Sequence, residues 1–409
     1  LCWGKGRGGW LGDGNTYGWN SAPTGATPTW SSFVDLPDNR SATQISGGSC
    51  ALLDNGSVVC WGTGLLGDGE YRSVDSGNSA WSPVYVTLPS GRRAVDISFG
   101  LDHSCLVLDG GDAMCWGANE YGQIGDETTC AEAAMGLGCE ELTAATVPDV
   151  RGKSIPSYVA ISPGRSVVDI EVYAGTSCAI LDGGSVSCWG KGSAGQLGNG
   201  ATDSSNTPVD VSLPANRTAM RLSEGYSSET PCAILDDNSA VCWGVGASGQ
   251  LGNNDAANSH IPVVVQMPSD LGLIEISAGD SHVCAVAVDG TAYCWGSANT
   301  DSSLGDGSTG NSLLPVQITL PAGRSATTIS APPNWPSHAC VGLDDGTVAC
   351  WGHGNGAGTG SSQSVPTVIA DFSSMPYGKS WADPWTTSMW FGPSLASEGS
   401  SSAGLVDDQ

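Results

Sequence analysis

Basic residues are scarce in this sequence, and their scarcity excludes one class of partner. The 409-residue chain has 14 lysines and arginines against 41 aspartates and glutamates, which gives a formal net charge of −27. Such a chain repels the phosphate backbone of a nucleic acid, and no basic cluster interrupts the excess of acid. We therefore expect no nucleic-acid partner.

Long apolar runs and known catalytic motifs are also missing. No stretch approaches the roughly 18 apolar residues that span a bilayer, so we expect no membrane span. The sequence has no Gly-x-Ser-x-Gly elbow, no HExxH pair and no P-loop, and its five histidines do not complete a zinc site with the cysteines. These absences predict a protein that is not an enzyme and has no cofactor, no catalytic residues and no metal site.

One motif dominates what is present. Six segments each contain a cysteine, nine further residues, a second cysteine and Trp-Gly. The tryptophans of the Trp-Gly pairs are 52–58 residues apart, with one interval of 73, and stand at Trp3, Trp61, Trp116, Trp189, Trp243, Trp295 and Trp351. One such unit cannot bury its own apolar face, so the period predicts a propeller or an array.

The segment between the two cysteines predicts a hairpin with a three-residue loop. A two-residue turn at Asn55-Gly56 would place Cys50 and Cys60 on opposite faces of the hairpin, whereas a loop of Asp54-Asn55-Gly56 places them directly opposite each other. The third loop position then needs a residue that tolerates positive φ. In the six copies it is Gly56, Gly111, Gly184, Asn238, Gly290 and Gly346.

The cysteine register indicates disulfides. The expected pairs are Cys50–Cys60, Cys105–Cys115, Cys178–Cys188, Cys232–Cys242, Cys284–Cys294 and Cys340–Cys350, with Cys130–Cys139 in a separate insertion. Cys2 has no obvious partner. Disulfides predict an oxidising compartment, and thus an extracellular or cell-surface protein. The alternative is a cytosolic protein with buried free thiols.

A second recurring element links the hairpins. Leu36-Pro37, Leu88-Pro89 and Leu320-Pro321 each precede an Ile-centred alternating strand, and proline is typical of a strand edge. Each unit therefore contains four short strands, as one propeller blade does. The sequence predicts an all-β fold.

These motifs resemble the regulator of chromosome condensation repeat family. Its strand, hairpin and loop signatures stand here as Ile97 to Gly100, His103-Ser104, Leu108 to Gly111, Trp116-Gly117 and Gly122-Gln123-Ile124-Gly125. The resemblance extends from residue 1 to about 391. It implies a seven-bladed β-propeller, and it does not imply exchange-factor activity on a GTPase. Secreted bacterial propellers of this family include protein inhibitors of β-lactamase, so the fold also serves protein binding.

Two regions depart from the repeat. Residues 118–163 contain an insertion, which is either a functional loop or a tolerated decoration. Residues 375–391 begin an eighth connector, and 392–409 read as a Gly/Ser-rich tail. We expect one propeller over 1–391, with its first blade completed by 375–391 and with residues 379–391 beside Leu1 to Gly6. This closure would gather Trp10, Trp19, Trp30, Trp381, Trp385 and Trp390.

The six gathered tryptophans have two interpretations. They form an interaction surface, or they fill the space left by missing strands.

Histidines and aspartates at repeated positions favour structural roles. His103, His282 and His338 all stand two residues before the first cysteine of a hairpin, and repetition on separate blades argues against catalysis. Asp13, Asp68, Asp126 and Asp306 share one Gly-Asp turn. Structural calcium is possible there, but one carboxylate per turn is too few ligands, so turn formation is favoured.

Three functional hypotheses follow. The first is an extracellular, non-catalytic binding or scaffold propeller whose loops contact a protein or a glycan. The second is a self-associating surface or fibre subunit. The least favoured is a hydrolase or lyase built on a propeller.

Overall fold

A computed structural model describes most of the chain. The described residues are 2–3, 12–14, 31–32, 34–37, 40–47, 49–72, 79–130, 140–144, 147–226, 228–269, 271–298, 303–331, 338–353, 361–371 and 402–403. Within these ranges every named secondary-structure element is a β-strand. No helix in the described ranges has the length and hydropathy needed to cross a membrane.

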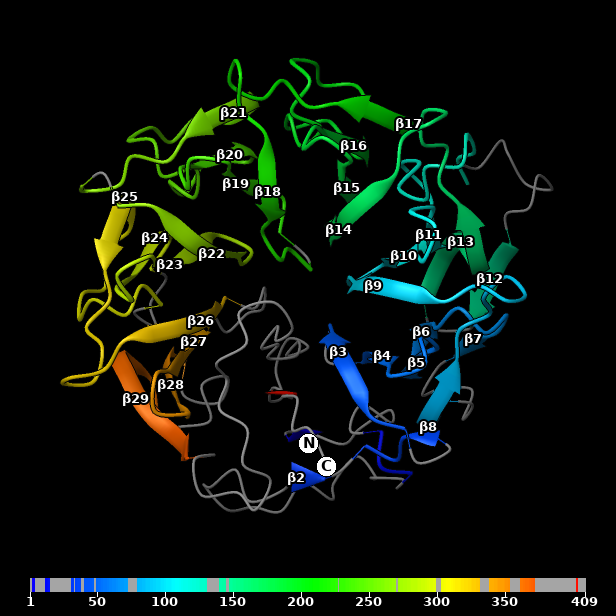
Figure 1. The fold of residues 1–409 in the computed structure, drawn as a ribbon, viewed down its shortest axis with the longest axis horizontal. Helices are drawn as coiled ribbons and strands as arrows, with labels where there is room; N and C mark the ends of the chain where they lie inside the picture. Colours follow the sequence, from blue (N-terminus) through cyan, green and yellow to red (C-terminus); the bar gives the residue numbers. More distant parts are fainter. Residues whose placement is uncertain are drawn as a thin grey trace.

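The strands form six antiparallel blades around one axis (Figure 1). In each blade the strand nearest the axis comes first in the sequence, and the strands follow outward in sequence order except in blade 2, where β12 (Glu140–Ala144) lies outside β13 (Val147–Tyr158) (Figure 1). Blades 1 to 3 consist of β3 (Ala42–Ser46), β4 (Cys50–Leu53), β5 (Val58–Gly62) and β8 (Ala80–Tyr85); β9 (Ala94–Phe99), β10 (His103–Leu108), β11 (Ala113–Ala118), β13 (Val147–Tyr158) and β12 (Glu140–Ala144); and β14 (Val167–Tyr173), β15 (Thr176–Leu181), β16 (Val186–Gly190) and β17 (Ser205–Asp210).

Blades 4 to 6 repeat this order. They consist of β18 (Ala219–Leu222), β19 (Cys232–Leu235), β20 (Ala240–Gly244) and β21 (Ser259–Val264); β22 (Leu273–Ala278), β23 (His282–Ala287), β24 (Ala292–Gly296) and β25 (Ser312–Gln317); and β26 (Ala326–Ser330), β27 (His338–Leu343), β28 (Thr347–Gly352) and β29 (Gln363–Asp371). A small hairpin of β6 (Gly64–Leu65) and β7 (Tyr71–Arg72) follows β5.

The hairpins have the register predicted from the cysteine spacing. Cys50 lies opposite Cys60 and Cys178 opposite Cys188, and the same pairing recurs in the other four blades. All six pairs are bonded, with Cα atoms 4.0–4.1 Å apart. The third loop position has positive φ in every hairpin, from 63° at Asn238 to 81° at Gly346. The three-residue loop therefore sets the register that the disulfide requires.

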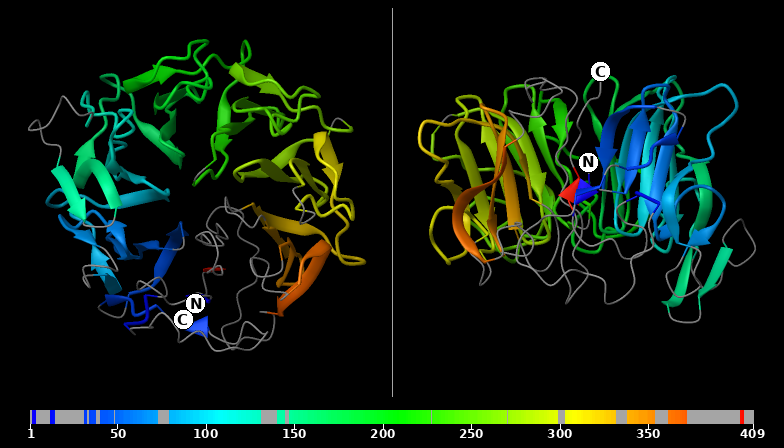
Figure 2. Two further views of the ribbon diagram at one scale, coloured as in Figure 1. Left: turned by 180° about the vertical axis from the view of Figure 1, so that it is seen from behind. Right: turned by 90° about the horizontal axis from the view of Figure 1, so that it is seen from below.

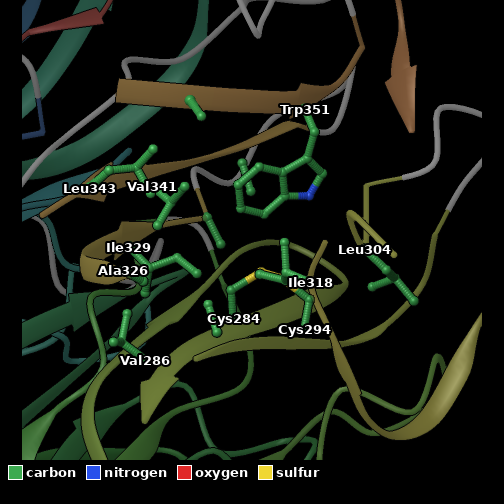
Figure 3. Close-up of a cluster of buried hydrophobic side chains, with 14 of the residues drawn as sticks. Cys284, Val286, Cys294, Leu304, Ile318, Ala326, Ile329, Val341, Leu343 and Trp351 are labelled. Carbon is green, nitrogen blue, oxygen red and sulfur yellow. A yellow bond between two sulfur atoms is a disulfide. The ribbon is translucent and has the colours of Figure 1, made fainter. Parts of the chain in front are cut away.

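The Trp-Gly tryptophans pack between blades. Those of the six blades are at most 1% exposed. In blades 2 to 6 the indole Nε1–H donates to a loop carbonyl of the preceding blade; Trp189 donates to Gln123 at 2.9 Å and Trp351 to Ser303 at 2.8 Å. Trp351 belongs to an apolar cluster that blades 5 and 6 build together (Figure 3). The core is thus a series of layers between neighbouring blades.

The Gly-Gln-Leu-Gly loop is shaped by that tryptophan. Leu197 is fully buried, and Gly198 has a φ of 63°. A Cβ atom on Gly198 would lie 3.0 Å from the ring of Trp243, and one on Gly125 would lie 2.5 Å from Nε1 of Trp189. The second glycine of the motif is therefore required both by its φ and by the close approach of the next blade.

The insertion of blade 2 is an extension of its sheet. β12 pairs with the first half of β13, so this blade has five strands, and their hairpin projects beyond the ring (Figure 2). The carbonyl of Ser154 accepts a hydrogen bond of 3.1 Å from the N–H of Gly69 in blade 1. Cys130 is buried and disulfide-bonded, while its predicted partner Cys139 lies outside the described residues.

Short terminal strands lie between blades 6 and 1 (Figure 1). β1 (Cys2–Trp3) pairs with β2 (Ser31–Ser32) and with β30 (Ser402–Ala403). β30 falls within the segment predicted to be a tail. Residues 379–391, predicted to lie beside the N-terminus, are outside the described residues, so the predicted domain boundaries stay predictions.

The described ranges thus contain six full blades in place of the seven predicted. The N-terminal segment nevertheless packs on blade 1 as a preceding blade does. A Cβ on Gly12 would lie 3.1 Å from the Trp61 ring, and Asp35 donates to the carbonyl of Gly12 at 2.8 Å. The same contacts join Gly67 to Trp116 and to Thr87.

Candidate functional site

The innermost strands share a bulge near their start. In each, the register shifts at the second position, so one residue is extra relative to the neighbouring strand. The extra residues are Thr43, Val95, Val168, Met220, Ile274 and Thr327. Because the blades are built alike, these residues occupy one level of the ring.

Four of the bulge residues form an exposed apolar row. The exposed fractions are 56% for Val95, 61% for Val168, 64% for Met220 and 45% for Ile274. They stand on blades 2 to 5, which are consecutive around the axis (Figure 1). We call these four residues the aliphatic arc.

The residue after each bulge is polar, and in four of the six blades its side chain forms hydrogen bonds with the next blade. These six residues, the polar belt, are Gln44, Asp96, Asp169, Arg221, Glu275 and Thr328. Asp96 accepts hydrogen bonds from Gln44 Nε2 at 3.0 Å and from the N–H of Ile170 at 3.3 Å. Asp169 accepts from the N–H of Leu222 at 3.0 Å. The belt therefore joins neighbouring inner strands where no strand pairing exists.

Glu275 makes the same connection between blades 5 and 6. Its carboxylate accepts from Thr328 Oγ1 at 2.8 Å and from the N–H of Ile329 at 3.2 Å. One level deeper, Ser98 Oγ donates to Glu171 at 2.7 Å and accepts from the N–H of Val172 at 3.1 Å. Polar side chains thus hold the inner strands together at two levels.

Crowding of carboxyl groups changes their protonation. Burial, then the charge of Asp96, raises the pKa of Asp169 to about 7. Burial, then Glu224, raises the pKa of Glu275 to about 8. Glu171 has a pKa well above its usual value because of burial and of Asp169, Glu224 and Asp96. The arginine of the belt, Arg221, opposes the shift at Asp169 and Glu275.

The opposite end of the inner strands is crossed by a loop. The segment between β18 and β19 extends from blade 4 toward the axis (Figure 1). The carbonyl of Tyr226 accepts from the N–H of Leu101 in blade 2 at 3.4 Å, and that of Glu224 from Ala278 in blade 5 at 2.9 Å. Tyr226 is buried with a φ of 33°, and burial with Asp102 and Asp280 raises its pKa. The carbonyl of Ser228 also accepts from the N–H of Ala174 in blade 3 at 3.0 Å, so this loop joins four blades.

The repeated histidines lie between blades. His103, His282 and His338 are at most 2% exposed. His103 Nε2 lies 2.7 Å from Ser177 Oγ of blade 3. Burial lowers the pKa of His103 to about 3 and that of His282 to about 4, so both rings are neutral at physiological pH. Their position supports a packing role.

The repeated Gly-Asp turns are closed by their own side chains. Asp68 Oδ1 accepts from Glu70 N–H at 3.2 Å, and Asp306 Oδ1 from Ser308 N–H at 2.9 Å. Asp126 also forms an ion pair with Lys153 of the insertion. Among the described residues, no group of three or more His, Cys, Asp or Glu side chains is arranged to hold a metal ion.

The interaction surface predicted from the sequence consists of residues outside the aliphatic arc and the polar belt. Trp10, Trp19, Trp30, Trp381, Trp385 and Trp390 all lie outside the described residues, so that surface stays a prediction. The aliphatic arc and the polar belt were missed. Their signal is the pair of residues before the strand Ile or Leu, which varies from copy to copy while its neighbours repeat.

Comparison with known proteins identifies the repeats. The sequence model described as the regulator of chromosome condensation (RCC1) repeat matches residues 183–227, 239–286 and 289–331. A second model of the same repeat matches 94–123 and 273–302. These matches cover blades 2 to 6 in part or in full.

Curated relatives share this part of the sequence at low identity. The human E3 ubiquitin-protein ligase HERC2 is 27% identical over 335 residues, which are 80% of this chain and 6% of the ligase. The chain therefore corresponds to a small part of that enzyme. The ultraviolet-B receptor UVR8 of Arabidopsis thaliana is 25% identical over 366 residues, 89% of this chain and 74% of the receptor.

A solved structure supports the fold. Prp20p of Saccharomyces cerevisiae, described with binding properties to Gsp1p and histones, superposes with a TM-score of 0.69 at 20% identity. The superposition covers 100% of this chain and 91% of Prp20p. At this identity the likeness establishes the β-propeller fold alone.

Proposed function

We propose that this chain, a β-propeller carrying regulator of chromosome condensation repeats, is a non-catalytic binding protein that holds a partner protein on the aliphatic arc. The repeats belong to a class of propeller that serves as a protein-binding or regulatory scaffold. The proposal gives this chain its own binding surface and does not transfer the partner of any relative.

The observation that carries the proposal is the position of the arc. A single exposed aliphatic residue is ordinary, but here four stand at the same structural position on four consecutive blades. Exposed apolar residues gathered in this way mark an interaction site. Aliphatic side chains suit the apolar centre of a protein interface, which favours a protein partner over a glycan.

We further propose an extracellular or cell-surface location. The support is chemical. The hairpins that build the blades contain six disulfides, and their cysteines are fully buried. Such bonds form and persist in oxidising environments.

We also propose that the two terminal segments together form a seventh blade. Its support is the blade-like packing of Gly12 and Asp35 on blade 1 and the pairing of β1 with β30.

Site-specific photo-cross-linking tests the binding surface. A photoreactive residue replaces Met220 in one variant and Val264, a 52% exposed residue of the outer strand β21, in the other. Each of the two variants is incubated with the mixture of native extracellular proteins and then irradiated. We expect a cross-linked partner from position 220 alone, and we expect V168S to reduce its yield.

Equal cross-linking from positions 220 and 264, or from neither, contradicts the proposal. A product of twice the chain mass from position 220, together with a dimer in solution that V168S dissociates, would identify self-association as the function instead.

A further inference from the structure

We propose that the partner held on the aliphatic arc presents a basic segment with apolar side chains, and that its binding releases protons from carboxyl groups of the inner strands to solvent. This inference rests on the proposed function and adds the chemistry of the partner.

The residues of the aliphatic arc and those of the polar belt are neighbours in sequence on the same strands. Met220 precedes Arg221, Ile274 precedes Glu275 and Val168 precedes Asp169 on the same strands. A segment that packs on the arc therefore lies one residue from the polar belt on each blade. Any charge that the segment carries interacts directly with the belt.

The belt and its second level carry an excess of acid. The carboxyl groups of Asp96, Asp169, Glu171, Glu224 and Glu275 face a single arginine, Arg221. Asp96, Asp169, Glu171 and Glu275 accept hydrogen bonds from neutral donors: backbone N–H groups, Gln44, Ser98 and Thr328. An acidic partner would be repelled here, and a basic one attracted.

Nearby arginines do not relieve this excess. Every inner strand except β22 is preceded by an arginine that pairs with the hairpin turn of its own blade. Arg92 lies 2.6 Å from Asp109, Arg165 lies 2.7 Å from Asp182, and Arg217 lies 2.6 Å from Asp237. On blades 2 to 4 these arginines are therefore paired with aspartates of the turns, while the carboxyl groups on the axis side face Arg221 alone.

The crowded carboxyl groups couple binding to protons. Asp169 faces Asp96, Glu171 and Arg221; Glu275 faces Glu224, Arg221 and the Thr328 hydroxyl; Glu171 faces Asp169, Glu224, Asp96 and the Ser98 hydroxyl. Near neutral pH these groups share protons. When a lysine or arginine of the partner arrives, a carboxylic acid becomes a carboxylate that pairs with the cation, and its proton goes to solvent.

Calorimetric titration with short synthetic peptides tests the inference. The first peptide alternates Lys with Leu, the second alternates Lys with Ser, and the third alternates Glu with Leu. We expect the Lys–Leu peptide to bind about tenfold more tightly than either of the others, because it alone matches both the arc and the belt. Titration in two buffers of different ionisation enthalpy should show release of on the order of one proton per complex near pH 7.5.

Matched variants separate the belt from the overall charge. D169N/E275Q keeps an acceptor oxygen for Leu222 and Ile329 while removing two titrating groups. D203N/D255N removes two exposed carboxylates elsewhere. We expect the belt variant to weaken Lys–Leu binding about tenfold and to reduce proton release, and the control to change affinity by less than about twofold.

Each outcome decides between specific alternatives. Equal weakening by both double variants would mean attraction by the diffuse negative charge and would overturn the inference. Tight binding of the Glu–Leu peptide would also overturn it, while cross-linking from position 220 would leave the proposed function intact. If D169N/E275Q does not fold, the pH dependence of wild-type binding decides, because proton release requires the affinity for Lys–Leu to rise between about pH 6 and pH 8.

Discussion

The tryptophan layer between blades and the polar belt around the axis each recur once per blade, but they vary differently. The layer has the same residue in all six described blades, and in five of them the indole N–H donates to the corresponding loop carbonyl. The belt has five different residue types at the same position in the six blades: Gln44, Asp96, Asp169, Arg221, Glu275 and Thr328. Because the backbone repeats, an unchanged position reflects a demand of the fold, and a changed one is free to carry the particular chemistry of this chain.

The junction between blades 4 and 5 is an intermediate case. Elsewhere a glycine of the hairpin turn faces a side chain of the next blade: a Cβ on Gly184 would lie 2.5 Å from the Cβ of Thr218, and one on Gly290 would lie 2.7 Å from that of Ser325. At this junction Asn238 occupies the turn and Gly272 faces it, with 2.6 Å from a Cβ built on Gly272 to the Asn238 Cβ. The space between the two blades is the same, but here the side chain that fills it comes from the hairpin turn of blade 4 and not from blade 5.

Removing a tryptophan should have the largest effect. Trp189 is fully buried and donates to Gln123, so W189A leaves a cavity between blades 2 and 3 and removes one of the two hydrogen bonds to the Gln123 carbonyl. We expect a loss of about 3–5 kcal/mol in the free energy of unfolding, measured by denaturant titration. D169N, at the belt, should cost less than about 1 kcal/mol. Similar costs for the two would contradict the division between structural and variable positions.

Removing one disulfide should have the next largest effect. The Cys178–Cys188 bond closes a short loop within the hairpin of blade 3. We expect the double variant C178A/C188A to lose about 2–3 kcal/mol, measured in the same titration. Alkylation of the wild-type protein, unfolded in denaturant without reductant, should leave both cysteines unmodified; their recovery as alkylated thiols would sink the disulfide assignment and the proposed location.

The exchanged pair at the blade 4–5 junction should show coupling. G272S places a side chain against Asn238 and should cost about 1–3 kcal/mol, because the junction is already filled. Adding N238G recreates the arrangement of Gly290 and Ser325 and should restore most of that loss. A double-mutant cycle measures the coupling, expected at about 1–2 kcal/mol. Additive effects would mean that the two positions do not share one space.

The smallest predicted effect is the pH dependence of stability that the polar belt causes. The pKa values of Asp169, about 7, and of Glu275, about 8, lie above those of the unfolded chain, so the folded state binds more protons between about pH 4 and pH 8. Stability is therefore lost as the pH rises through this window, and the loss is complete above about pH 8. Because both groups are half-buried, we expect on the order of 1 kcal/mol between pH 5 and pH 9.

Thermal melts across this range measure the effect. The variant D169N/E275Q should show a flatter profile than wild type, while D203N/D255N should keep the wild-type slope. A wild-type stability that rises with pH across the window would contradict the raised pKa values.

Features set by local repetition were predictable from sequence. The cysteine spacing and the loop residue Asn238 predicted the hairpin register and the positive φ, because a three-residue loop and a disulfide restrict neighbours within one hairpin. The burial of Trp189 followed from its recurrence at one place in every unit. The extra strand β12 of the insertion at 118–163 was not predicted, because it joins the sheet of blade 2 only through pairing with the first half of β13, beyond the four strands that the repeat anticipates.

Features that depend on two blades together were decided by the tertiary structure. Asp96 and Ile170 are far apart in the chain, and only ring packing brings the carboxylate to that N–H group. The same holds for Asn238 and Gly272, where one residue fills the space that the other leaves. The sequence by itself determined the blade, its disulfide and its buried tryptophan, because those depend on residues within one repeat. How blades meet at the axis depends on side-chain volume and charge across neighbouring repeats, which only their packing specifies.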